Sequence, residues 1–106
     1  IVWQKSMQLV TKVYQYTKNL PKEEVYGLVS QMRRAAVSIP SNIAEGSRRG
    51  SRKDYRNFLI QGFSSGAELE TQIEITKNIY HTQSMEMENL LEEVMKMLNK
   101  MVQQLK

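Results

Sequence analysis

The fold is decided by the stretch QMRRAAVSIPSNIAEGS, residues 31–47. Apolar positions in this stretch and just before it are separated alternately by four and three residues, which is the spacing of one face of an α-helix. These positions are Val25, Val29, Met32, Ala36, Ile39 and Ile43. The pattern predicts a helix over residues 22–45.

Pro40 stands inside this expected helix. A proline has no backbone N–H to donate, and its ring clashes with the preceding turn, so we expect the helix to kink there. Ser38, Ser41 and Asn42 flank the proline. We expect their hydroxyl and amide groups to satisfy the backbone groups that the kink frees.

The same spacing recurs on both sides and predicts three more helices, over residues 2–19, 51–81 and 84–106. In the first helix the expected core positions are Trp3, Met7, Val10, Tyr14 and Thr17. Five of the seven methionines fall between Met85 and Met101, and we interpret them mainly as bundle core. Met97 lies off the main apolar row, so we expect part of that helix to meet a second protomer.

Short links separate the expected helices. Pro21 follows the first helix, Gly46 and Gly50 bracket a tight loop after the second, and Ser51 and Ser84 are the expected N-caps of the third and fourth. Helices joined by short links run up-down-up-down. The sequence therefore predicts an all-α, antiparallel four-helix bundle with a kinked second helix, as a single domain over residues 1–106.

Gly62 and Gly66 lie one turn apart inside the expected third helix. A glycine in a helix interior costs roughly 0.5–1 kcal/mol against alanine. We expect a compensating gain, namely the close approach of a neighbouring helix.

The positive charge is concentrated in one part of the chain. The net charge is +4, and residues 31–60 hold seven basic and two acidic side chains. Five of the basic side chains form what we call the basic segment, in the expected loop and the first turns of the third helix: Arg48, Arg49, Arg52, Lys53 and Arg56. Arginine suits forked contact with phosphate, and the neighbouring Tyr55 is a candidate to stack on a base. A merely solvated basic loop is the alternative, and the sequence leaves both open.

Arg33 and Arg34 lie mid-helix, so we expect at least one of them to be partly buried and paired with a carboxylate. Glu45, Glu68 and Glu70 are the candidate partners. We interpret this pairing as structural rather than as ligand contact.

Catalysis and metal binding find no support in the sequence. The only histidine is His81, at the expected end of a helix, and no nucleophile, base and acid can be assembled around it. We therefore predict no enzyme activity, no cofactor and no metal.

There is no cysteine, which favours the reducing cytoplasm as the compartment. No apolar run is long enough to span a membrane. Ile1 is not a start methionine, so we expect the true N-terminus to lie further upstream.

Residues 31–47, together with KNLPKEEVYGL at 18–28 and GAELETQ at 66–72, resemble the four-helix-bundle family named for the 23S rRNA intervening-sequence protein. The resemblance covers about residues 3–100. It implies a homopentameric ring and members encoded within insertions in bacterial 23S rRNA genes. It also implies kinship with the accessory proteins of diversity-generating retroelements, which bind a reverse transcriptase and nucleic acid. The motif residues carried over, with an expected structural role, are Arg33, Arg34, Ser38, Pro40, Asn42, Glu45 and Gly46.

Two functional hypotheses follow. In the first, a pentameric ring binds the phosphate backbone of RNA or DNA through the basic segment. In the second, the ring is a protein-interaction scaffold that recruits a partner enzyme, such as a reverse transcriptase, without touching nucleic acid.

Overall fold

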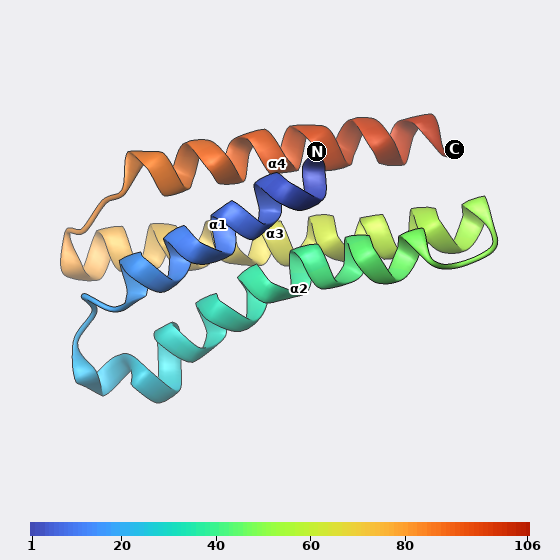
Figure 1. Ribbon diagram of the computed structural model, residues 1–106. Helices are drawn as coiled ribbons and strands as arrows, with labels where there is room; N and C mark the ends of the chain where they lie inside the picture. The colour runs from blue at the N-terminus through green and yellow to red at the C-terminus, as the bar shows by residue number, and fades with distance from the viewer.

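The computed structural model describes all of residues 1–106 and contains four α-helices and no strand. The helices are α1 (Val2–Thr17), α2 (Ser30–Ser47), α3 (Arg52–Tyr80) and α4 (Met85–Gln104). Each helix runs antiparallel to the one before it (Figure 1). The expected up-down-up-down bundle is confirmed.

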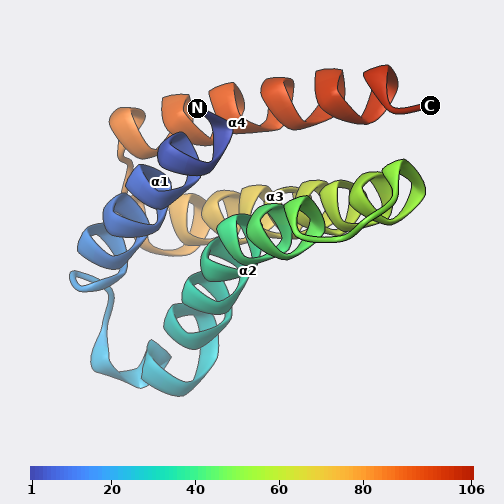
Figure 2. The same ribbon diagram turned by 45° about the vertical axis from the view of Figure 1, so that its right-hand side comes forward.

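The four helices differ in length, and this gives the molecule two unlike ends. α1 and α3 occupy opposite corners of the bundle, since each packs against both α2 and α4. At 1.5 Å per residue, α1 is about 24 Å long and α3 about 43 Å. α1 therefore covers only the part of α3 near Tyr80, as Figure 2 shows. We call this the four-helix end. The other, where only α2, α3 and α4 meet, is the three-helix end.

The expected core face of α1 is confirmed at Thr17, which is buried, and in part at Val10, which packs against the core, but it is wrong at the other positions. Val2, Leu9 and Val13 are buried, whereas Trp3 and Met7 are 42% and 43% exposed. The two rows have nearly the same spacing and differ by one position, about 100° around the helix. Ser6 takes a core position because its hydroxyl donates to the carbonyl of Trp3 at 2.7 Å, so no polar group is left unpaired. An apolar face of α1 is consequently left outside the core.

α2 begins at Ser30, eight residues later than expected. Lys22–Glu24 form a short 3₁₀ turn and Val25–Val29 a wide π turn, with a break at Gly27 (φ −111°, ψ −110°). The Glu24 carboxylate accepts the N–H of Leu28 at 3.3 Å. A Cβ on Gly27 would lie 3.0 Å from the same carboxylate oxygen. The π turn that leads into α2 is thus capped by Glu24, and the absence of a side chain at Gly27 leaves room for this carboxylate.

α2 changes direction near its middle, where Pro40 lies (Figure 1). The Ser41 hydroxyl donates to the carbonyl of Val37, and the Asn42 amide donates to the carbonyl of Ser38, both at 2.8 Å. These carbonyls neighbour the one that the N–H of an ordinary residue 40 would bond. The Ser38 hydroxyl also lies 2.8 Å from the Ser65 hydroxyl of α3. Ser41 and Asn42 thus bond carbonyls close to that of Ala36, the one that Pro40 deprives of a donor, and not that carbonyl itself, while Ser38 ties the kink to α3.

The closest approach of α2 and α3 is at Gly46, not at Gly62. α2 continues through Gly46 to Ser47, so the prediction that Gly46 opens the loop is wrong. Gly46 is buried, and a Cβ there would lie 2.7 Å from the Phe58 Cβ. A Cβ on Gly62 would meet only ordinary contacts at 3.7 Å, and the space beside Gly66 holds the Met95 thioether. Each glycine faces a neighbouring helix. A Cβ on Gly66 would displace the flexible side chain of Met95, whereas a Cβ on Gly46 would meet an atom that is fixed to the backbone of α3.

The starts of α3 and α4 follow the sequence predictions, and so do the methionines of α4 except Met85, which is 58% exposed. The Ser51 hydroxyl accepts the N–H of Asp54 at 3.0 Å, and the Ser84 hydroxyl accepts that of Met87 at 3.3 Å. Met87 is fully buried, and Met95, Met97 and Met101 pack against the core. No helix combines the length and apolar composition that a membrane crossing requires.

Candidate nucleic-acid interface

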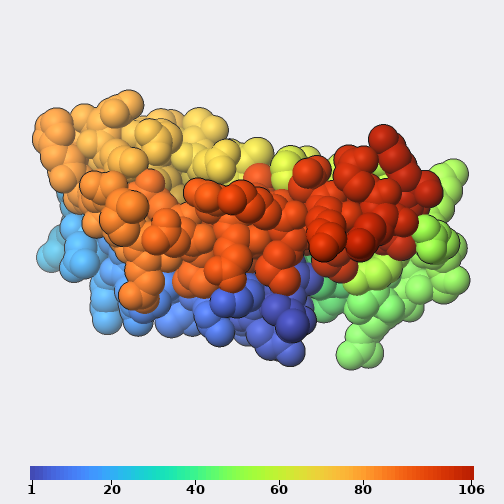
Figure 3. Space-filling view, turned by 90° about the horizontal axis from the view of Figure 1, so that it is seen from above, coloured from blue at the N-terminus to red at the C-terminus, as the bar shows by residue number.

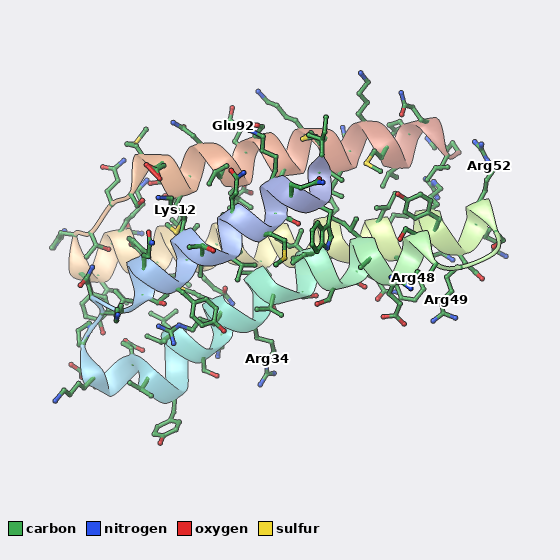
Figure 4. All side chains as sticks on the ribbon, viewed as in Figure 1. Lys12, Arg34, Arg48, Arg49, Arg52 and Glu92 are labelled. Carbon is green, nitrogen blue, oxygen red and sulfur yellow. The ribbon has the colours of Figure 1, made fainter.

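The basic segment lies at the three-helix end, in the turn between α2 and α3 and the first turns of α3. Figure 4 shows Arg48, Arg49 and Arg52 together at this end. Arg48, Arg49, Arg52 and Lys53 are exposed, and Arg56 is half-buried. The five side chains therefore gather at one end of the bundle, as the sequence predicts.

Two of the arginines hold the C-terminus of α4. Arg52 donates from Nη2 to the carbonyl of Gln104 at 3.0 Å, and Arg56 donates from Nε to the carbonyl of Val102 at 3.1 Å. The last carbonyls of a helix have no partner within the helix and carry its negative dipole end. Arg52 and Arg56 thus cap α4. Each still keeps N–H groups for an outside anion, since a guanidinium has five.

Arg49 is also held in place. Its Nη2 donates to Glu45 at 3.0 Å, and its guanidinium lies 4.8 Å from the centre of the Phe58 ring. Glu45 is one of the two acidic side chains in residues 31–60, and its ion pair with Arg49 neutralises its negative charge. Tyr55 is half-buried against the core beneath Gly46. This packing leaves only part of the Tyr55 ring accessible to a base.

Arg48 and Lys53 make no hydrogen bond or ion pair with the rest of the chain. Lys100 and Lys106, near the end of α4, are exposed and unpaired as well. The contacts of Arg52 and Arg56 bring the end of α4 to the basic segment. Sequence reasoning missed these lysines because about 50 residues separate them from the segment. These lysines could have been found from the sequence, because the end of a fourth antiparallel helix lies beside the start of the third.

Arg33 holds the end of α1 rather than a carboxylate. It donates from Nε to the Thr17 hydroxyl at 2.9 Å, and its guanidinium lies 4.3 Å from the centre of the Tyr14 ring. Its Nη2 donates to the carbonyl of Tyr14 at 3.4 Å. The prediction of a carboxylate partner is wrong for Arg33. The C-terminus of α1 and the face of the Tyr14 ring supply the negative potential instead. Arg34 is exposed and points away from the bundle (Figure 4).

The four-helix end is closed by hydroxyl and carboxylate contacts. The Tyr16 hydroxyl lies 2.7 Å from the Thr76 hydroxyl and also contacts that of Thr82. The Tyr80 hydroxyl donates to Glu24, and this hydrogen bond, with burial and the negative charge of Glu24, raises the pKa of Tyr80 to about 12. The exposed cations at this end are Lys18 and Lys22, with no arginine beside them that caps α4.

Acidic side chains line a cavity of about 400 Å³ between α3 and α4, with Glu70, Glu74, Glu88 and Glu92 around it. Lys77 bridges two of them, donating to Glu88 at 3.0 Å and to Glu74 at 3.3 Å, and these contacts raise the pKa of Lys77. No three His, Cys, Asp or Glu side chains are placed to hold a metal ion. His81 is exposed and ends α3 in the left-handed conformation (φ 56°).

A family model described as 23S rRNA-intervening sequence protein matches residues 1–100. The chain belongs to this family. A similar solved structure is that of a protein of unknown function from the S23 ribosomal protein family of Bacteroides thetaiotaomicron. It is 23% identical, with a TM-score of 0.83, and the match covers 96% of this chain and 98% of that one. No curated protein matches. At this identity the likeness shows the fold, and neither description states an activity.

In this chain, the residues of the 31–47 motif lie mostly at helix contacts. Ser38, Asn42 and Gly46 face α3, and Pro40 lies at the bend of α2. Arg33 contacts α1, and Glu45 pairs with Arg49. Arg34 is the exception, because it is exposed and its side chain makes no hydrogen bond or ion pair.

Proposed function

We propose that this protein is a non-catalytic, homopentameric nucleic-acid-binding protein that contacts the phosphate backbone with the basic segment. The observation that carries the proposal is the state of its five cations. Arg49, Arg52 and Arg56 are held by the bundle, while Arg48 and Lys53 have no partner within it. Lys100 and Lys106 extend the same surface.

The geometry suits phosphate more than bases. The held arginines lose less side-chain entropy on binding an anion, since their positions are already fixed. Tyr55 is partly buried against the core, so we expect little base readout, and contacts with phosphate position a nucleic acid without reading its sequence. We therefore expect weak sequence preference and strong salt dependence.

The pentamer would repeat the basic segment five times around a ring. Each protomer carries a net charge of +4. A polyanion long enough to reach several copies would gain affinity by avidity, without any new contact. Short oligonucleotides that span one copy should therefore bind much more weakly than long ones.

The test is a salt titration of binding to an RNA hairpin by fluorescence anisotropy. Changing Arg48 and Lys53 together to alanine should weaken binding and lower the salt slope by about 2, since each phosphate contact contributes about 1. Stability should not change, because neither side chain has a partner. The matched control changes the exposed Lys18 and Lys22, at the other end of the bundle, to alanine. Equal losses in both double variants would show only a general effect of charge and would refute this site.

A protein-interaction scaffold is the second candidate, and Tyr26 is the observation that favours it. Tyr26 is 96% exposed and stands beside Val25, which is 46% exposed, at the tip of the link before α2. An exposed aromatic residue of this kind is typical of a protein contact. A partner retained from host lysate after nuclease treatment, and lost when Tyr26 is changed to Ala, would favour the scaffold over nucleic-acid binding.

A further inference from the structure

The first relevant surface is a groove between α1 and α2, which we call the α1–α2 groove. It holds about 300 Å³, and its lining carries no charged residue. Trp3, Met7 and Val37 line it and are 42%, 43% and 40% exposed. Pro40 and Ala44 form its floor on α2. Large apolar side chains that share one groove in this way mark a contact surface more than a solvated face.

The second surface is the outer face of α3, which we call the α3 stripe. It consists of exposed residues that follow one another by three or four positions: Ile60, Ser64, Ala67, Thr71 and Ile75. They lie opposite the buried side that holds Leu59, Leu69 and Ile73. The outermost face of a bundle helix ordinarily carries charged residues. Here it is uncharged over more than four turns, and its central residues are small enough for another helix to approach closely.

The two surfaces lie on opposite sides of the molecule. α1 and α3 are at diagonal corners of the bundle, and Figure 3 shows them along opposite long sides with α4 between them. Two different faces on opposite sides cannot meet within one chain. They can meet between successive copies in a head-to-tail arrangement, which closes into a ring when the rotation between copies allows it.

Charge at the borders of the two surfaces is complementary. Arg34 lies one turn before Val37 of the groove, is exposed, and makes no ion pair. Glu68 lies one turn from both Ser64 and Thr71 of the stripe and is also exposed and unpaired. An unpaired cation beside one apolar face and an unpaired carboxylate beside the other favour a second copy as the occupant.

We propose that the α3 stripe of one protomer packs into the α1–α2 groove of the next, with Arg34 of one copy paired with Glu68 of its neighbour. The proposal rests on the ring proposed above and assigns its contact faces. Trp3 and Met7 would cover the small residues Ser64 and Ala67, which lets α3 approach α1 and α2 closely. The basic segment lies beyond α1 at the three-helix end, so this contact leaves it free for nucleic acid.

The first experiment uses two single variants and their mixture. Met7→Lys charges the groove and Thr71→Lys charges the stripe, and both positions are exposed, so the fold should survive. Light scattering should show each variant alone as a monomer, with the helical circular dichroism of the wild type. The mixture should form a one-to-one dimer, because the intact stripe of Met7→Lys fits the intact groove of Thr71→Lys.

The outcomes separate this inference from the proposed function. A wild-type protein that is monomeric would overturn both the ring and this interface. A wild-type oligomer that persists in both variants would overturn the interface alone. A variant that still dimerises with itself would also overturn it, because it would show a symmetric contact. RNA binding by the two monomeric variants tests the basic segment independently, since neither substitution touches it.

The second experiment exchanges the two border charges. Arg34→Glu and Glu68→Arg should each weaken assembly by about 5-fold or more per contact, and the double variant should recover most of the loss. Lys18→Glu, a charge reversal at an exposed residue remote from both faces, is the control. A double variant that assembles no better than the single variants would disprove the Arg34–Glu68 pair.

Discussion

The two ends of this bundle join their helices by different chemistry. At the four-helix end, the contacts are made by hydroxyls and carboxylates, as in Tyr16 with Thr76 and Tyr80 with Glu24. At the three-helix end, Arg52 and Arg56 bind the last carbonyls of α4, and Gly46 lets α2 and α3 touch. Using arginine as the joining group leaves extra N–H donors at the surface. Arg33 caps α1 in a similar way at the four-helix end, but only at the three-helix end do two such arginines lie beside the unpaired side chains of Arg48 and Lys53. This end therefore combines structural contacts with the larger free capacity for an anion.

The substitution with the largest expected effect on stability is Gly46→Ala, at the three-helix end. In Gly46→Ala, the new Cβ would lie 2.7 Å from the Phe58 Cβ, which cannot move without its backbone. Overpacking of this kind costs about 1–3 kcal/mol. Urea unfolding followed by circular dichroism should show the lower midpoint. Gly62→Ala is the matched control, since its Cβ meets ordinary contacts at 3.7 Å, and we expect it to gain about 0.4–1 kcal/mol. Equal losses at both glycines would contradict the assignment of the close approach to Gly46.

At the four-helix end, Tyr16→Phe removes the hydroxyl that contacts Thr76 of α3 and Thr82 of the α3–α4 link. A hydrogen bond of this kind contributes about 0.5–1.5 kcal/mol, and thermal unfolding should show a loss in that range. Tyr26→Phe removes a hydroxyl from a side chain that is 96% exposed, so it should change nothing. A Tyr16→Phe protein as stable as the wild type would mean that the hydroxyl contacts do not hold this end.

The Tyr80–Glu24 contact predicts a loss of stability at high pH. The pKa of Tyr80 is raised from 10.0 to about 12, so the folded protein favours the neutral phenol. Its contribution to stability is complete below pH 10 and is lost as the pH rises towards 12. Tyrosinate absorbance should show this late titration, and Tyr80→Phe should abolish it. In Glu24→Gln the pKa should fall towards 10, because the main cause of the shift is gone.

The smallest expected effect is at the cap of α4. Arg56→Gln removes the donor to the carbonyl of Val102, and a cation at a helix C-terminus contributes about 0.3–1 kcal/mol. Hydrogen exchange should become faster in the last turn of α4 and stay unchanged near Met87. Lys53→Gln, which removes an unpartnered charge three positions earlier, should leave that turn unchanged. Identical exchange in the two variants would show that Arg56 does not cap the helix.

The sequence predicts the four helices because their apolar rows and caps are local signals. Ser51 and Ser84 begin helices as expected. It fails for the core face of α1, where a serine replaces an apolar residue in the buried row by bonding its own helix. It also fails for the start of α2, because the Glu24 cap depends on a carboxylate that folds back onto the backbone.

For the basic segment too, the sequence predicts the position of the residues but not their contacts. Its position is readable from charge spacing, and all five cations lie at one end. Which of them are free is not readable, because the partners of Arg52 and Arg56 lie near the end of the chain. For the same reason, the periodic pattern could not show that Arg33 would find a helix end instead of a carboxylate. Long-range partners decide these roles, and a local pattern does not contain them.

The position of α1 has a consequence for how the protein is synthesised. α1 packs between α2 and α4, and the Lys5–Glu93 and Lys12–Glu86 ion pairs join it to α4. Because α1 is synthesised before α4, its packing is incomplete until α4 has left the ribosome. α2 and α3, adjacent in sequence and in closest contact, can pair before then. The nascent chain thus carries Leu9 and Val13 incompletely covered until α4 emerges.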